Sequence, residues 1–226
     1  MEALLLSLRL ALIVSVLLLV IGIPVAYWLA YSKWRGKFLL EALVALPLVL
    51  PPTVLGFYAL LAMGPHGPLG KISNRLFGRG LAFTFAGLVI ASVLYSFPFT
   101  VQPLMAAFQS VDRKLLAASA TLGAGRLRTF ARIILPLSLP GVLTAVVLSF
   151  AHTLGEFGVV LMVGGNLPGV TRTVSIAIYD HVQSLEYAQA SRLSLTLLAI
   201  SFAVLCFVYA VNRNTSRAMW GLWPAK

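Results

Sequence analysis

Long apolar segments alternate with short polar ones along this chain, and the alternation predicts where helices cross a membrane. The apolar segments cover about residues 3–30, 38–63, 81–108, 137–162 and 193–211. Each approaches or exceeds the roughly 20 residues that a membrane-spanning helix requires. We therefore expect an all-α integral membrane protein with about five transmembrane helices in a single domain, residues 1–226.

The segment from Val111 to Pro140 differs from its neighbours because it is basic and amphipathic. Leu115–Leu122 is a helix-forming run, and we expect Gly123 and Gly125 to end it, since glycine readily adopts the positive φ found at helix ends. A second helix should follow, until Pro136 breaks it for want of an amide donor. Two short helices joined by a glycine turn predict a docking element on the membrane surface.

The second of these helices has two faces. Apolar residues recur at i, i+3, i+4 and i+7, namely Leu127, Phe130, Ala131 and Ile134. Arg128 and Arg132, four residues apart, share another face. A helix pair lying on lipid headgroups would show the same pattern, so that interpretation stays open.

Composition excludes several classes of protein. With 60% hydrophobic and 10% charged residues, and a mean hydropathy of +0.96, the chain has too few charges for a water-soluble domain, which carries about a quarter. The net charge of +11 does not indicate nucleic acid, because the basic residues sit in short segments between apolar runs. They indicate topology and contact with membrane lipid instead.

No catalytic or nucleotide-binding constellation stands out in the sequence. The fragment from Gly64 to Ile72 imitates a phosphate-binding loop, but five residues instead of four lie between its first and last glycines, and Ile72 replaces the required Ser or Thr. His66, His152 and His181 fall in separate segments, which ranks a membrane-embedded enzyme lowest. We expect no cofactor in this chain, and energy for any work that it does must come from a partner.

Prolines within two of the apolar segments suggest where a solute passes. A proline leaves a backbone carbonyl unpaired, which a membrane tolerates only where the helix faces protein or a water-lined cavity. A kink that serves packing alone is an equal alternative. The candidate path residues at these breaks are Pro51, Pro52, Thr53, Gly56, Ser96, Pro98 and Thr100.

His152 and Glu156 raise a separate question at the end of the fourth apolar segment. They are four residues apart, so they can pair on one helix face, and ionisable groups at membrane depth are candidates for function. We favour a plainer role, in which Glu156 accepts from backbone amides where Gly155 and Gly158 break the helix. Glu156 is kept as a candidate path residue.

Two polar stretches complete the chain. Gly64 to Gly80 is expected to be a polar, glycine-rich loop on the outer side. Thr173 to Val182 is too short to cross a membrane, and we expect it to be re-entrant or interfacial.

The distribution of basic residues predicts the orientation. Segments placed inside hold Lys33, Arg35, Lys37, Arg113, Lys114, Arg126, Arg128, Arg132, Arg213 and Arg217. Lys71, Arg75 and Arg79 oppose this trend from the outer side without reversing it. We expect the N-terminus outside, the C-terminus in the cytoplasm, and Trp220 and Trp223 at the interface.

The docking segment resembles the EAA loop of ABC importer permeases. In that loop nine residues separate a glycine from an isoleucine, and one further residue separates the isoleucine from a Leu-Pro pair. Gly123, Ile133, Leu135 and Pro136 match, whereas Ala117, Ala118 and Ser119 stand at the Glu-Ala-Ala positions. The resemblance implies contact with ATPase subunits. The coupling residues it assigns are Ala117, Ala118, Ser119, Gly123, Ala124, Arg128, Phe130, Ile133, Leu135 and Pro136.

A second region narrows the resemblance to the molybdate and sulfate branch of these permeases. Gly155–Gly158, Gly165–Gly169, Thr171–Thr173 and Ala177–Tyr179 carry it. The resemblance implies a type I importer fold in a bacterial inner membrane, with two copies of this chain, two ATPase subunits and a periplasmic oxyanion-binding protein. It implies molybdate as cargo; sulfate, tungstate and phosphate are the alternatives, and a membrane scaffold without transport is a remote one.

Overall fold

The computed structural model describes residues 2–220, with side chains as far as Ala210 except Val208. The described residues form helices and no strands, so the expected all-α class is confirmed. The predictions made for Arg213, Arg217 and Trp220 concern side chains outside this description, and Trp223 lies beyond the described residues.

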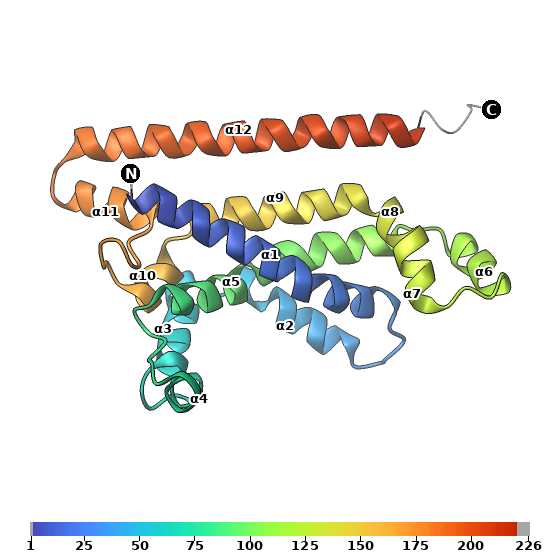
Figure 1. Ribbon diagram of the computed structural model, residues 1–226, viewed down its shortest axis with the longest axis horizontal. Coiled ribbons are helices and arrows are strands. Elements are labelled where there is room, and N and C mark those ends of the chain that lie inside the picture. Colours follow the sequence, from blue (N-terminus) through green and yellow to red (C-terminus); the bar gives the residue numbers. More distant parts are fainter. Residues whose placement is uncertain (1, 221–226) are drawn as a thin grey trace.

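Three helices form the centre of the molecule, and most others are arranged along them (Figure 1). The first part of the chain comprises α1 (Glu2–Tyr31), α2 (Lys37–Val49), α3 (Pro52–Met63), α4 (Pro68–Phe77) and α5 (Phe85–Gln109). The second comprises α6 (Arg113–Thr121), α7 (Arg126–Thr129), the π-helical turn η1 (Phe130–Ile134), α8 (Leu135–Leu137), α9 (Leu139–Gly155), α10 (Gly158–Gly164), α11 (Val174–Gln183) and α12 (Tyr187–Trp220). Helices α1, α5 and α9 pack against one another.

Small residues allow these central helices to approach closely. A Cβ atom added to Gly22 of α1 would lie 3.0 Å from Cγ2 of Thr100 on α5. One added to Gly141 of α9 would lie only 2.2 Å from Cβ of Ala107 on α5. Such contacts matter in a membrane, where helices associate through close packing rather than the hydrophobic effect.

The predicted span 38–63 is broken, the predicted span 137–162 is interrupted between α9 and α10, and a further bend precedes α9. Helices α2 and α3 meet at a bend of 110° around Leu50 and Pro51. The segment from Arg126 to Leu137 meets α9 at 72°. Helices α1, α5 and residues Tyr187–Phe207 of α12 are each long and apolar enough to cross a membrane, and the bent pairs raise the possible number of spans to five.

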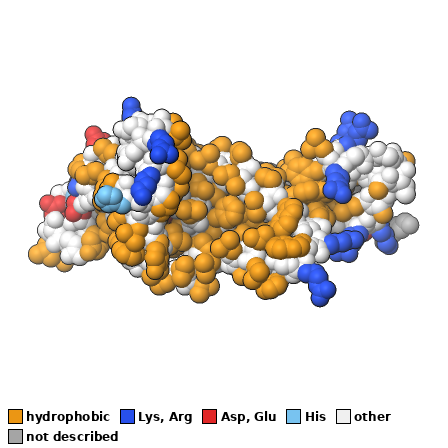
Figure 2. Space-filling view, turned by 90° about the horizontal axis from the view of Figure 1, so that it is seen from below, with side chains coloured by type: hydrophobic (Ala, Val, Ile, Leu, Met, Phe, Trp, Pro, Cys, Tyr) orange, Lys and Arg blue, Asp and Glu red, His pale blue; other side chains and the backbone are white. Residues whose placement is uncertain are grey.

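The surface agrees with a membrane environment. Figure 2 shows hydrophobic side chains over the middle of the molecule and lysine and arginine side chains gathered toward both ends. Helix α12 packs on α9 and α11, and most of its described apolar side chains, such as Leu198 and Phe202, face outward. Exposed apolar side chains on a long helix are stable when lipid surrounds them.

The segment expected to be a loop between Gly64 and Gly80 contains α4, so that prediction is wrong. Pro68 occupies the first turn, where its missing amide costs nothing, and Gly78 ends the helix with φ +64°. Both helix signals are present in the sequence, but the many glycines of this segment favoured the prediction of a loop.

Thr173 to Val182 forms most of α11, which packs on α12 and on α1. Figure 1 places α11 beside the N-terminus of α1, at the end of the bundle opposite α6 and α7. Thr173 caps it by accepting from the amide of Ile176, and Ser7 of α1 accepts from the amide of Val174 at 2.8 Å. These contacts fix a short helix at one end of the bundle.

The Gly141–Ala107 contact can be tested by changing both sides. Gly141→Ala should lower the free energy of unfolding by about 1–3 kcal/mol, because its methyl group overlaps that of Ala107. Adding Ala107→Gly should recover part of this loss, measured by thermal unfolding of the purified protein in detergent. Gly80→Ala, which meets nothing within 4 Å, is the control. Equal stability of Gly141→Ala and the unchanged protein would contradict the packing.

Candidate functional site

Two helix breaks that are far apart in the sequence lie against each other. Helix α3 begins at Pro52, after the bend that ends α2, and α9 ends at Gly155 before α10 begins at Gly158. A Cβ atom on Gly158 would lie 2.8 Å from Cβ of Pro52, so the two breaks touch. Non-helical backbone at membrane depth is stable where it is buried in protein or lines a cavity.

A cavity of about 630 Å³ lies at this meeting point. Its polar lining comes from Thr53 at the start of α3, Tyr95 of α5, His152 of α9 and Glu156 at the second break. The remaining lining residues are Pro52, Ala151, Gly155, Phe157, Gly158, Leu161 and Met162. The site therefore combines a few polar groups with an apolar wall, as ligand-binding cavities do.

His152 is held firmly in this cavity. Its Nδ1 lies 2.9 Å from Oγ of Ser96, which lies 3.0 Å from Oγ1 of Thr153. The imidazole stacks on Phe99, with ring centroids 3.9 Å apart and planes 25° from parallel, and its other neighbour is Tyr95. Because Nδ1 is taken by Ser96, Nε2 is the ring nitrogen left for a solute.

Glu156 is 4% exposed, and within the described structure neither carboxyl oxygen has a hydrogen-bond partner. The favoured interpretation, acceptance from backbone amides at the break, is therefore wrong, and so is pairing with His152. The carboxyl group faces Ser92 of α5, whose hydroxyl is also buried without a partner. An unpaired charge is costly in such a place. The Glu156 carboxyl group and the Ser92 hydroxyl are therefore polar groups near the α9–α10 break whose hydrogen bonds are not satisfied within the described residues.

The other candidate path residues divide between the cavity and the helix packing. Ser96 contacts the cavity through His152, and Pro51 precedes α3 on the exposed surface. Gly56 is buried against Met162, so its role in this structure is to let α3 approach α10. Thr100 packs against Gly22, and Pro98 is buried within α5, which runs unbroken through it.

The cavity residues Tyr95 and His152 were not among the candidate path residues, and neither was Phe99, which stacks on His152. Tyr95 and Phe99 are four residues apart on α5, a spacing that places them on one helix face. The sequence therefore indicated that Tyr95 and Phe99 share a helix face. It did not indicate that His152 of α9 packs against both rings.

The docking element forms a separate site at the other end of the bundle (Figure 1). Helix α6 begins with Asp112, whose carboxylate accepts from the amide of Lys114 at 2.8 Å. Gly123 ends the turn with φ +73°, and a Cβ atom added to it would meet nothing within 4 Å, so its conformation alone requires glycine. Ser119 is buried, and its hydroxyl lies 2.7 Å from Oγ1 of Thr129, which ties α6 to α7.

The tip of this element is apolar and exposed. Leu122 is 86% exposed and Leu127 is 81% exposed, so the expected apolar face of the second helix is only partly buried. Phe130 and Ile134 face the bundle, while Ala131 faces outward. Ala117, Ala118 and Arg128 are exposed as well. Exposed leucines among cations are a typical protein docking surface.

Pro136 does not break the second helix, contrary to expectation. The helix widens into the π-helical turn η1, where the amide of Leu135 bonds to the carbonyl of Phe130, and continues to Leu137. A π turn changes the pairing of the carbonyls ahead of the proline, so the missing donor is accommodated. The chain bends two residues later, at Ser138, whose hydroxyl donates to the Ala107 carbonyl at 3.2 Å.

An aromatic cluster fastens the docking element to the bundle. Phe130 lies edge-on to Tyr27 and Phe108, with centroid distances of 5.2 and 5.9 Å. The hydroxyl of Tyr31 donates to the carbonyl of Phe108 at 2.6 Å. Ile133 packs beside them and Ile134 is buried. The docking element is thus packed against the C-terminal ends of α1 and α5.

Comparison with known proteins explains this pairing of a docking element with a central cavity. A model of the family described as "binding-protein-dependent transport system inner membrane component" matches residues 22–217. The chain belongs to this family. Its expected identity as an ABC importer permease is confirmed.

The permease also has named relatives along nearly its whole length. It is 54% identical over 213 residues, 94% of each chain, to the molybdenum transport system permease protein ModB of Azotobacter vinelandii. It is 31% identical over 207 residues, 92% of this chain and 76% of the relative, to a probable sulfate transport system permease protein cysT of Helicosporidium. A bacterial ABC transporter that imports alginate has the same fold, with a TM-score of 0.74 at 17% identity, covering 93% and 79% of the two chains.

The Ser119–Thr129 bond in the permease's docking element can be tested directly. Ser119→Ala should speed amide hydrogen exchange in α6 and α7 about fivefold, because one buried hydrogen bond contributes about 1 kcal/mol. Thr121→Ala is the matched control, since its hydroxyl bonds only to the Ala118 carbonyl of its own helix. If both variants exchange at the same rate, Ser119 does not tie the two helices together.

Proposed function

We propose that this permease carries molybdate into the cytoplasm as part of an ATP-driven importer. The observation that carries the proposal is the 54% identity, over 94% of the chain, to a protein named as a molybdenum transport permease. The sulfate relative is more distant at 31%, so sulfate is the second candidate cargo. Both anions are tetrahedral and divalent, and a path for either needs hydrogen-bond donors without tight binding.

The working complex in this proposal contains two copies of the permease, two ATPase subunits and a periplasmic oxyanion-binding protein. The ATPases dock on α6, α7 and η1, where Leu122, Leu127 and Arg128 are exposed. The N-terminus then faces the outside and the C-terminus the cytoplasm. In this proposal ATP is hydrolysed by the ATPase subunits, and this chain is the membrane-spanning subunit.

The connection between ATPase and cargo runs along α5. Phe108, near its C-terminal end, contacts Phe130 of the docking element. Tyr95, Ser96 and Phe99, near its middle, hold His152 in the cavity. Movement of the docking element by the ATPases would shift α5 as a rod and change the cavity between two arrangements, which is alternating access.

His152 is the group best placed to meet the anion. Its ring is fixed by stacking and by Ser96, so Nε2 presents a pre-oriented donor when Nδ1 accepts from the Ser96 hydroxyl. Thr53 adds a hydroxyl to the same lining. One N–H donor and one hydroxyl bind a dianion weakly, and weak binding allows a transported anion to be released.

The glycine turn tests the coupling. Gly123→Val should abolish ATP-driven uptake, because valine is strained at φ +73°, while the permease still inserts in the membrane. Gly125→Ser is the matched control, since Gly125 has φ −68° and precedes α7 at a position where serine is favoured. Co-purification of the ATPase and uptake into vesicles are measured together. Normal uptake by Gly123→Val would remove the role given to this turn.

The cargo is tested by competition in vesicles that contain the complete complex. Uptake of labelled molybdate should be inhibited by tungstate and about tenfold less effectively by sulfate and phosphate. His152→Leu should lower molybdate uptake by about tenfold, the effect of losing one hydrogen bond to a charged group. His66→Leu, on the exposed turn before α4, should leave it unchanged.

The possible outcomes separate the parts of this proposal. Equal competition by sulfate and tungstate would favour the second cargo. Normal uptake by His152→Leu, with the ATPase bound, would place the path outside this cavity.

A further inference from the structure

Helix α4 is firmly attached to the rest of the permease on one side. A Cβ atom on Gly70 would lie 1.9 Å from the Gly64 carbonyl oxygen, and one on Gly67 would lie 2.1 Å from that of Leu61. The hydroxyl of Ser73 donates to the carbonyl of Arg79 at 2.7 Å, which draws the following turn back onto the helix. The orientation of α4 is therefore set by backbone contacts with the end of α3.

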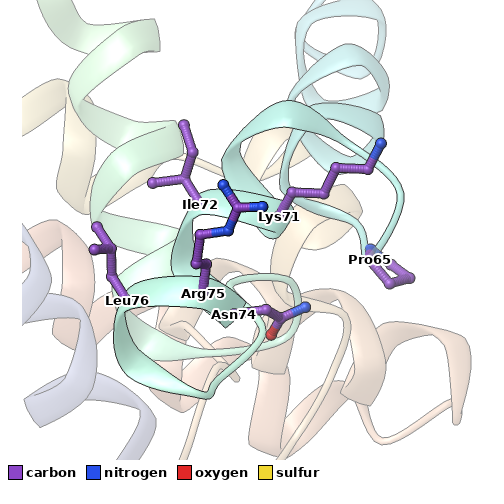
Figure 3. A pocket seen from close by; sticks show the side chains of 6 residues that line it. All are labelled: Pro65, Lys71, Ile72, Asn74, Arg75 and Leu76. Atoms are coloured by element: carbon purple, nitrogen blue, oxygen red, sulfur yellow. The ribbon is translucent and has the colours of Figure 1, made fainter.

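The opposite side of α4 carries cations and apolar side chains together. Lys71 and Arg75, one turn apart, are exposed, and none of the ion pairs found among residues 2–220 involves them. Ile72 and Leu76, also one turn apart, lie beside them, and Leu76 is 68% exposed. Figure 3 shows the long side chains of Lys71 and Arg75 extending from the helix with Ile72 and Leu76 next to them.

These side chains line a concavity of about 730 Å³. Half of its lining is cationic or polar, from Lys71, Asn74 and Arg75, and half is apolar, from Pro65, Ile72 and Leu76. A small inorganic anion would leave the apolar half unused. The mixed lining fits an amphiphile that has a negatively charged head and a hydrocarbon part.

The surroundings favour lipid over a soluble partner. Helix α3, which leads to α4, exposes Phe57, Tyr58 and Leu61. Figure 1 shows α3 and α4 extending away from the central bundle, and Figure 2 shows that the basic group on this side adjoins the continuous hydrophobic surface. An amphipathic helix at the edge of such a surface lies in the interface of a membrane, with its cations at phosphate level.

We propose that α4 binds the headgroup of an anionic phospholipid, with Lys71 and Arg75 on the phosphate and Ile72 and Leu76 against the acyl chains. The lipid holds α4 in the membrane interface, and through the contacts of Gly67 and Gly70 it steadies the end of α3. This inference does not depend on which anion the permease transports.

The test uses a fluorescent label on α4 and lipids that quench it. Phe77→Cys, in a Cys206→Ser background, carries the fluorophore, because residue 77 is next to the concavity without lining it. The labelled complex is placed in bilayers that contain nitroxide-labelled phosphatidylglycerol or phosphatidylcholine. Half-maximal quenching should need about tenfold less phosphatidylglycerol than phosphatidylcholine at low salt, and this preference should weaken as salt rises.

Matched variants assign the effect to α4. Lys71→Gln with Arg75→Gln should remove the preference for phosphatidylglycerol. Lys33→Gln with Arg35→Gln, which removes two exposed cations from the α1–α2 connection, should keep it. Ile72→Ser with Leu76→Ser should reduce quenching by both lipids.

Two results would overturn the proposal. One is equal quenching by the two lipids in the unsubstituted complex at low salt. The other is absence of quenching by either lipid together with a change of fluorescence when the soluble binding protein is added, which would assign α4 to a protein partner.

Discussion

The need to satisfy every backbone hydrogen bond inside a membrane governs this structure. A straight helix meets that need alone, whereas a broken helix must be buried in protein or face a cavity. The permease has breaks at Leu50–Pro51 and at Glu156–Phe157, and it brings them together where Gly158 touches Pro52. The two breaks thus lie beside one cavity, which Pro52, Glu156 and Phe157 line.

The same constraint applies to α5, the helix that links docking element and cavity in the proposed mechanism. It contains Pro98 and Pro103 and still runs as one helix from Phe85 to Gln109, packed on α1 and α9. Its middle holds His152 through Tyr95, Ser96 and Phe99, and Phe108 near its end contacts Phe130 of the docking element. A mechanical link between two sites requires a rigid element such as this continuous helix. Isolated side-chain contacts would not couple the two sites.

We propose two different uses for the amphipathic segments of this chain. The segment α6 to η1 exposes Leu122 and Leu127 at the end of the molecule that is rich in arginine, where a protein partner is expected. Helix α4 exposes Ile72 and Leu76 beside Lys71 and Arg75 next to the lipid-facing surface. Both segments place apolar residues with helical periodicity. Their place in the fold distinguishes a protein surface from a lipid surface.

The sequence by itself determined the all-α class, the positions of the long apolar helices and the docking element with its turn at Gly123, because these depend on hydrophobicity and on local backbone preferences. It did not determine the outcome at Pro136, where a π turn accommodates the proline, or at Glu156, which has no amide partner. Nor did it show that Thr100 packs on Gly22 while His152 enters the cavity. Only the tertiary structure decided these, because helix rotation and the meeting of two distant breaks depend on long-range packing that periodicity does not encode.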